Sequence, residues 1–146
     1  MIDITGKPIS QRSAVARARV ALSHAALDAM RQGTLPKGDA VGVSRIAGIM
    51  AAKKCADLIP YCHQIPLKHV EVSITPSDEG VEIIATARAE ASTGVEMEAL
   101  TAVTVAALTI YDMCKALDPA ATIEDVCVVH KSGGKGGDWE RPAVGA

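Results

Sequence analysis

KHVEVSITPSDEGVEIIATARA, residues 68–89, is the stretch that decides the fold we expect. In its first part apolar and polar residues alternate, so the valines and the isoleucine of VEVSI share one side of an extended chain. Residues 81–89 alternate again, and SDEG at 77–80 has the composition of a turn. The stretch therefore predicts a β-hairpin with one buried face.

Helices and strands are expected on both sides of this hairpin. Residues 13–22 alternate loosely, which favours a strand, although the many alanines leave a helix open. Ser23 and Gly33 are a typical start and stop for a helix at 23–33. The remaining elements are a helix at 40–59 that ends before Pro60, a helix at 94–117 opened by Ser92 or Thr93, and a strand at 122–131.

The order of these elements indicates the fold class. It is β-α-α-β-β-α-β, and setting one helix aside leaves βαββαβ. That is the ferredoxin-like arrangement, an α+β fold in which helices cover one face of an antiparallel sheet. A chain of 146 residues has the usual size of one domain, so we expect a single domain over 1–146.

The long helix also predicts an oligomer. Its middle, AVTVAALTIY at 102–111, is apolar or small nearly all round, which is typical of a helix buried on more than one side. In so small a domain, the second side is most simply covered by another subunit. We therefore expect the chain to assemble with copies of itself.

Composition argues against several classes of partner. The formal net charge is −2 and aromatic residues make up 2% of the chain, which disfavours nucleic-acid binding through a basic field or through base stacking. We expect no membrane span and no signal sequence, because no apolar run is long enough and MIDITGKPISQRS lacks an apolar core. The expected location is the cytoplasm, where the four cysteines would stay reduced.

Lys53 continues an apolar stripe on the second helix. Ile46, Ile49 and Met50 precede it by seven, four and three residues. Such a lysine can simply extend its head into water at the end of the helix, and a pair with Asp57 at i+4 is also possible. A lysine that faces a ligand is the alternative at this position.

On the long helix, charged residues lie at both ends of one face. Glu98 stands near its start, and Asp112 and Lys115 stand near its end at spacing i, i+3. These side chains can be ordinary surface charges, and Glu96 and Glu98 in the first turn also suit the helix dipole. Partial burial would instead shift their pKa values toward catalytic use. The two glutamates point to different sides, so they are not a glycosidase-like pair.

Two glycine-containing segments can hold an anion. KSGGKGG at 131–137 combines lysines with glycines whose N–H groups can approach a phosphate, and LPKGD at 35–39 places Lys37 before a helix. Flexible basic loops are the alternative for both. Together with Lys53 and Lys115, they suggest a polyphosphate site. Mutual repulsion would lower the pKa of one lysine and prepare it for proton transfer.

The adjacent Cys62 and His63 do not form a convincing metal or thiol site. Zinc sites usually show closely spaced ligand pairs, and here just Cys55 and His69 lie nearby in the sequence. Adjacent residues in an extended segment also point to opposite faces, which disfavours a Cys–His dyad. A packed cysteine beside a polar histidine that faces the substrate fits better, and no metal is expected.

Four segments together resemble one protein family. RIAGIMAAK (45–53), DLIPYCH (57–63), GVEMEALTAVTVAALTIYDMCKA (94–116) and KSGGK (131–135) are similar to the MoaC family, the cyclic pyranopterin monophosphate synthases of molybdenum cofactor biosynthesis. The start, MIDITGK, also resembles the start of that family. The resemblance covers nearly the whole chain.

The resemblance implies an assembly and a reaction. The subunit would be ferredoxin-like and would form a homohexamer, a trimer of dimers, with active sites between subunits and no redox cofactor. The enzyme would convert 3′,8-cyclo-7,8-dihydro-GTP into cyclic pyranopterin monophosphate and release diphosphate.

The resemblance also implies roles for individual residues. The essential acid is Asp112, with catalytic lysines at Lys37, Lys53 and Lys115. The residues that would contact the substrate are Arg12, Tyr61, Cys62, His63, Glu96, Met97, Glu98 and Lys131. Tyr61 and Gln64 depart from the leucine and proline that the family more often has, so the loop around His63 is where differences are expected.

Two other classes of protein remain open. A nucleotide-binding regulator would use the same basic pocket and would not consume the cyclised substrate. A metal-dependent hydrolase would use Cys62, His63 and His69 and would lose activity with a chelator.

Overall fold

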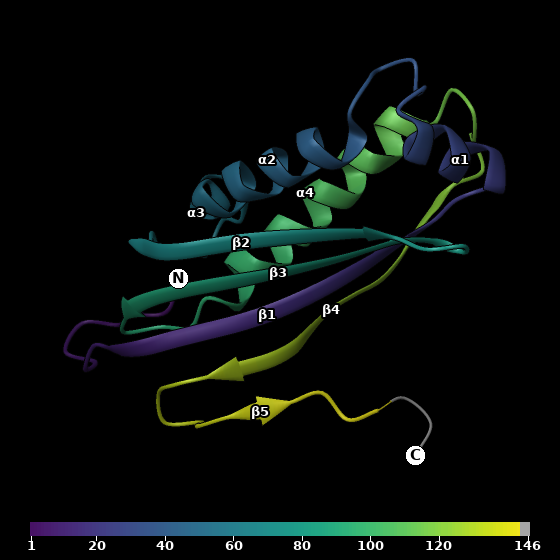
Figure 1. Cartoon of the computed structure of the whole chain (residues 1–146). Coiled ribbons are helices and arrows are strands. Elements are labelled where there is room, and N and C mark those ends of the chain that lie inside the picture. The colour runs from purple at the N-terminus through teal and green to yellow at the C-terminus, as the bar shows by residue number, and fades with distance from the viewer. Residues whose placement is uncertain (144–146) are drawn as a thin grey trace.

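The structure is a computed structural model that describes residues 1–143 (Figure 1). One antiparallel sheet carries the helices on one of its faces. The elements are β1 (Ser10–Ala21), α1 (His24–Gln32), α2 (Ala40–Lys53), α3 (Cys55–Leu58), β2 (Leu67–Pro76), β3 (Gly80–Ala91), α4 (Glu96–Cys114), β4 (Thr122–Ser132) and β5 (Trp139–Glu140).

The strand order confirms the expected fold class. Within the described residues the sheet runs β2-β3-β1-β4-β5, and all four pairings are antiparallel. Its first four strands have the order of the ferredoxin-like βαββαβ arrangement, in which each helix links two strands that are not neighbours. Figure 1 shows α2 and α4 lying together over the sheet.

The core is built from small residues. Alternate positions of β1 and β3 face α4, and the partners Ala14↔Ala87 and Ala16↔Ala85 are fully buried. On α2, Gly48 lets the helix approach α4 closely, since a side-chain carbon there would lie 2.9 Å from the backbone oxygen of Ala102. Because the contacting side chains are small, the helices and the sheet lie close together.

The face of α2 that contacts the core differs from the stripe that the sequence suggests. Ile46 and Met50 are 60% and 53% exposed. The buried positions are Ala40, Ser44, Gly48, Ala51 and Ala52. Small residues occupy this side because α4 lies so close. Ile46 and Met50 therefore point away from the core, whereas Ile49 of the predicted stripe is partly buried against it.

Several predicted boundaries need correction. The helix predicted over 40–59 is interrupted at Lys54, whose φ of −110° and ψ of 13° separate α2 from α3. Ser92 or Thr93 was the expected cap of α4, but this helix starts after Val95 and no side chain caps it. Ser23 and Gly33 do terminate α1 as predicted. The short strand β5 follows the glycine loop and was not predicted.

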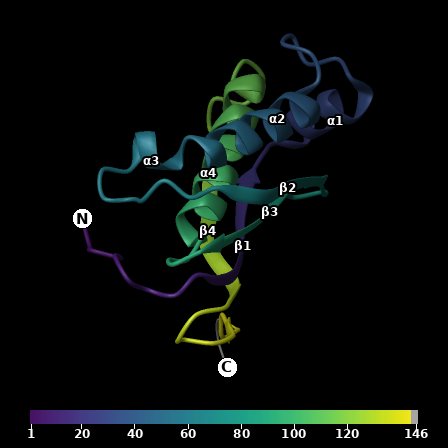
Figure 2. The ribbon, with the colours of Figure 1, turned by 90° about the vertical axis from the view of Figure 1, so that its left-hand side faces the viewer.

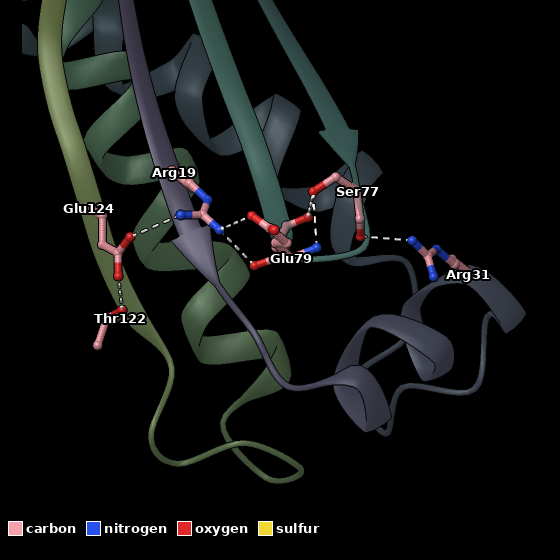
Figure 3. A network of polar contacts seen from close by, with 7 residues as sticks. Arg19, Arg31, Ser77, Glu79, Thr122 and Glu124 are labelled. Atoms are coloured by element: carbon pink, nitrogen blue, oxygen red, sulfur yellow. Dashed lines mark hydrogen bonds and ion pairs between the residues drawn. The ribbon is translucent and has the colours of Figure 1, made fainter. Parts of the chain in front are cut away.

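The end of the sheet away from α3 is held by exposed ion pairs (Figure 3). Arg19 contacts Glu124 of β4 and Glu79 of the β2–β3 turn, each at 3.4 Å. Arg31 of α1 donates to the backbone oxygen of Ser77 at 2.7 Å. These contacts fix the hairpin turn against its neighbours, and they involve no predicted site residue.

Helix α4 is the one described helix that is long and apolar enough to cross a membrane by length and composition. Half of that stretch is buried inside the folded chain. Its packing against the sheet and α2 identifies it as the core helix of the fold.

Candidate functional site

The predicted site residues gather at the two ends of α4. The first-turn cluster, near the start of the helix, comprises Arg12, Lys53, Tyr61, Cys62, His63, Glu96, Met97, Glu98 and Lys131. The last-turn cluster, at its other end, comprises Lys37, Asp112 and Lys115. Sixteen residues separate Glu96 from Asp112, so at about 1.5 Å per residue these positions lie about 24 Å apart along the axis.

In the last-turn cluster, Asp112 lies between two lysines. Lys37 Nζ is 2.6 Å from one carboxylate oxygen and Lys115 Nζ is 2.8 Å from the other. All three side chains are about half exposed. Hydrogen bonds from Lys115 and Lys37 lower the pKa of Asp112 to about 2. The cluster therefore carries one net positive charge, with two ammonium groups ready for an anion.

One electrostatic expectation is wrong for Lys115. Repulsion between lysines was expected to lower a lysine pKa, but the hydrogen bond to Asp112 raises the pKa of Lys115. The nearest charge decides the direction, and here that charge is a carboxylate. In the single chain, Lys115 is therefore a firmly held cation.

The loop before α2 positions Lys37. Leu35 is buried in the core, and Asp39 caps α2 by accepting from the N–H of Gly42 at 2.9 Å. Gly38 has a φ of 90°, a conformation that favours glycine. Because the loop is anchored on both sides of Lys37, its side chain reaches across to α4.

The first-turn cluster contains a basic, glycine-lined side. Lys131 Nζ contacts Glu96 Oε1 at 3.1 Å, and Arg12 Nε donates to the backbone oxygen of Ala91 at 3.4 Å. Gly134 abuts the Arg12 guanidinium so closely that a side chain there would collide with it. A cavity of about 800 Å³ borders this loop and is lined by Lys7, Arg12 and Lys135 among others. This side of the cluster suits a phosphate chain.

His63 lies on the other side of the cluster. Its Nε2 is 2.8 Å from the backbone oxygen of Ile2. A carbonyl can only accept, so Nε2 carries the proton in this hydrogen bond and Nδ1 is free to accept in the neutral ring. Figure 2 shows the N-terminal segment at the same end of the molecule as α3 and the loop that follows it.

Two cavities meet around His63. One of about 520 Å³ is lined by Ile2, Tyr61, Cys62, His63, Glu96, Met97 and Glu98 among others. A second of about 380 Å³ is lined by Lys53, Cys55, Asp57, His63 and Glu98 among others. His63 and Glu98 border both cavities, so they stand where the two spaces adjoin.

Glu98 is the most deeply buried acid of the cluster. Its residue is 3% exposed, and its Oε2 has no hydrogen-bond partner in the described chain. Burial raises the pKa of Glu98, and the nearby Glu96 adds to the effect. Cys55 lines the same cavity, and its buried thiol accepts from Thr101 Oγ1 at 3.4 Å.

Two side-chain contacts that the sequence analysis considered, one as possible and one as disfavoured, are absent from residues 1–143. No ion pair joins Lys53 to Asp57, and no hydrogen bond joins the side chains of Cys62 and His63 within this range. The same residues contain no group of three or more His, Cys, Asp or Glu side chains placed to hold a metal ion. The four cysteines carry free thiols.

Sequence reasoning did not single out four contributors to the cavities. The backbone oxygen of Ile2 accepts a hydrogen bond from His63 Nε2. Lys7 and Lys135 line the basic cavity, and Cys55 lines the same cavity as Glu98. MIDITGK and KSGGK were recognised as segments, but neither spacing nor periodicity indicates which of their residues face a cavity.

Comparison with known proteins identifies the family. The model of the MoaC family matches residues 1–134. The chain is 51% identical over 144 residues to a cyclic pyranopterin monophosphate synthase of Chloroflexus aurantiacus, covering 97% of this chain and 88% of that protein. It is 53% identical over 141 residues to cyclic pyranopterin monophosphate synthase 2 of Mycobacterium tuberculosis, covering 97% and 84%. A synthase of the same name from Nostoc sp. is 52% identical over 145 residues, covering 98% and 86%. The chain therefore belongs to the MoaC family.

Proposed function

We propose that this protein is a cyclic pyranopterin monophosphate synthase. It would convert 3′,8-cyclo-7,8-dihydro-GTP into cyclic pyranopterin monophosphate and release diphosphate, an early step of molybdenum cofactor biosynthesis. The observation that carries this proposal is the family match over residues 1–134, together with about 50% identity to synthases over nearly the full chain. Residues 1–146 would act as a single domain.

The spacing of the two clusters supports a site shared between subunits. A group that transfers a proton must come within hydrogen-bond reach of its substrate, and about 24 Å along α4 separates the clusters of one chain. In a symmetric dimer, the first-turn cluster of one subunit can face the last-turn cluster of the other, and each pair of subunits then holds two equivalent sites.

The outward side of α2 offers a surface for such assembly. Ile46 and Met50 are large, apolar and more than half exposed, and Leu108 of α4 is 52% exposed. Exposed apolar groups of this kind mark contact surfaces between proteins. We assign this side to a contact within a homohexamer, a trimer of dimers, as the family resemblance implies.

The lysines and Arg12 would bind the triphosphate. Lys37 and Lys115 would come from the last-turn cluster, and Arg12, Lys53 and Lys131 from the first-turn cluster. As an oxygen of the sugar-derived part attacks the α-phosphorus, negative charge grows on the departing diphosphate, and these cations would stabilise it. With so few aromatic residues, polar side chains rather than stacking would recognise the base.

The proton transfers would fall to the remaining polar groups. Asp112 and its two lysines are the acid and base candidates of one cluster. His63 would orient the substrate, with Tyr61, Cys62 and Met97 forming the wall of the cavity and Glu96 holding Lys131. This scheme uses no redox cofactor and no metal.

The protein would work in the cytoplasm, and neither nucleic acid nor membrane is part of the proposal.

An assay with the cyclised GTP substrate tests this function. Diphosphate release and fluorescence of the oxidised pterin product are measured together, with and without a chelator. We expect both signals, and no effect of the chelator. Binding of guanine nucleotides without turnover would identify a regulator instead, and loss of activity with chelator would identify a metal-dependent enzyme.

A further inference from the structure

Two glutamates in the first turn of α4 have opposite surroundings. Glu96 is partly exposed, and its Oε1 contacts Lys131 Nζ at 3.1 Å. Glu98 is 3% exposed, and its Oε2 is shielded from solvent with no hydrogen-bond partner in residues 1–143. Glu96 therefore has a cation beside its carboxylate, whereas Oε2 of Glu98, two residues further along the helix, has no partner.

The groups around Glu98 do not neutralise a negative charge in the folded chain. Lys53 of α2, Cys55 and Asp57 of α3, and His63 of the following loop line the same cavity. No ion pair joins Lys53 or His63 to Glu98 in the described residues. Burial raises the pKa of Cys55 to about 11, so this thiol is neutral. On α4 itself, burial raises the pKa of Glu98 most, a hydrogen bond from its own backbone N–H partly offsets this, and repulsion from Glu96 adds to the rise.

From this geometry we propose that Glu98 is protonated in the resting enzyme at neutral pH, and that it donates this proton to the substrate when the five-membered ring opens. The proposal rests on the proposed function and assigns Glu98 a role that substrate contact alone does not give it.

The physical reason is the cost of burying an unpaired charge. An ionised carboxylate with no cation nearby and one oxygen left without a hydrogen-bond donor is disfavoured away from water, so the acid keeps its proton. Burial raises the pKa of Glu98 in agreement with this, whereas Glu96 has a lysine to hold its charge. Neighbouring acids whose surroundings separate their pKa values are a recurrent source of distinct acid and base roles.

The proton transfer is a balanced step. When a carbon–nitrogen bond of the five-membered ring breaks, its electron pair stays on the departing nitrogen, and the lone pair of the other ring nitrogen on the same carbon forms a C=N bond. The proton moves from the Glu98 carboxyl to the departing nitrogen and leaves a carboxylate. Glu98 borders both cavities around His63, so the carboxylate can recover its proton from water that enters through them. The step consumes no oxidant and no reductant.

Nuclear magnetic resonance tests the protonation state without any turnover. The assembled, full-length protein is labelled with glutamate that carries ¹³C at the carboxyl, and each side-chain signal is followed with pH. The Glu98→Gln variant assigns one signal and the Glu96→Gln variant assigns the other. We expect the Glu98 signal to titrate above the ordinary value of 4.5 and to be protonated at pH 7. A titration midpoint below pH 7 would overturn the proposal, even if the enzyme is an active synthase.

Kinetics of the same variants tests the donor role. Glutamine keeps the shape and an N–H donor but has no proton to give, so Glu98→Gln should change KM little and lower kcat by about 100-fold or more. Glu98→Asp, which keeps an acid, should recover part of kcat. A Glu98→Gln enzyme with normal kcat would refute proton donation. Thermal unfolding shows whether each variant is folded, and the titration of the wild-type protein does not depend on them.

Discussion

The two ends of α4 hold carboxylates in opposite states. At the last turn, Asp112 is half exposed and contacts two lysines, and its pKa falls to about 2. At the first turn, Glu98 is buried, its Oε2 has no hydrogen-bond partner in residues 1–143, and burial raises its pKa. One helix therefore presents an anion between two cations at one end and a buried carboxyl with a raised pKa at the other.

This contrast shows how one small chain can supply different kinds of chemistry. The exposed end provides fixed charges for an anion, and the cavity-lined end provides a titratable acid beside His63. The distance between them means that a single subunit keeps the two functions apart. Assembly is then the step that would bring both to one substrate.

The largest loss of turnover is expected from a substitution in the last-turn cluster. Asp112→Asn removes the anion that holds Lys37 and Lys115, so turnover should fall by about 10²–10⁴-fold while the protein still folds and assembles. Diphosphate release measures turnover, and size-exclusion chromatography measures assembly. Asp28→Asn is a matched control, because this exposed aspartate contacts Arg31 at 3.7 Å outside both clusters. Wild-type turnover of Asp112→Asn would remove this cluster from the mechanism.

A smaller loss of activity is expected from a substitution in the first-turn cluster. Lys53→Ala should lower kcat/KM by about 10²-fold, because a cation that stabilises the transferring phosphate is lost. Lys54→Ala is the control, since this neighbouring lysine lies at the break between α2 and α3 and does not line the cavity. Equal losses in both variants would mean that general positive charge, rather than the position of Lys53, matters.

The dependence of stability on pH should separate the two carboxylates. Between pH 4.5 and the raised pKa of Glu98, the folded protein binds a proton that the unfolded chain does not, so this residue lowers stability as pH rises. Glu98→Gln should remove that loss and raise the unfolding temperature more at pH 8 than at pH 5.

Asp112 should behave in the opposite way. Its low pKa stabilises the folded state above its ordinary value of 3.8, and this contribution disappears as pH falls toward 2. Asp112→Asn should therefore lower the unfolding temperature by a constant amount between pH 5 and 8, and this difference from wild type should shrink as pH falls from 3.8 toward 2. Thermal unfolding followed by circular dichroism measures both variants, and identical pH profiles would contradict the assigned surroundings.

The smallest effect is expected at the end of the sheet that Figure 3 shows. Arg19→Ala removes two exposed ion pairs, which should cost about 0.2–1 kcal/mol each and leave turnover unchanged. Chemical denaturation measures the stability and the diphosphate assay the turnover. A clear loss of kcat would show that this end of the sheet contributes to the site.

Periodicity predicts the parts of the fold that depend on regular repetition. The hairpin, the order of the elements and the ends of α1 at Ser23 and Gly33 follow from alternation, helical spacing and capping chemistry. The break at Lys54 depends on local backbone angles. The buried side of α2 depends on how closely Gly48 approaches Ala102, which no pattern within one helix contains.

The contacts of the candidate site also fall into those that local spacing predicts and those that depend on the packing of distant segments. Local spacing predicts that Asp112 and Lys115 contact each other, and they do at 2.8 Å. Lys37 joins them from a loop distant in sequence, and the isolation of Glu98 depends on α2, α3 and the loop that carries His63. Whether a buried acid has a partner is a property of the packed chain, so neither its burial nor its pKa could be read from GVEME.

Mixing two inactive variants tests the central claim, that one site combines the two ends of α4 from different subunits. Lys53→Ala and Asp112→Asn proteins are unfolded together at equal concentration and refolded, so that mixed oligomers form. In a mixed dimer, one of the two sites receives both intact clusters. The account predicts that activity recovers to about a quarter of the wild-type value, since half of the subunits carry each intact cluster. Activity no higher than that of either variant alone would contradict it.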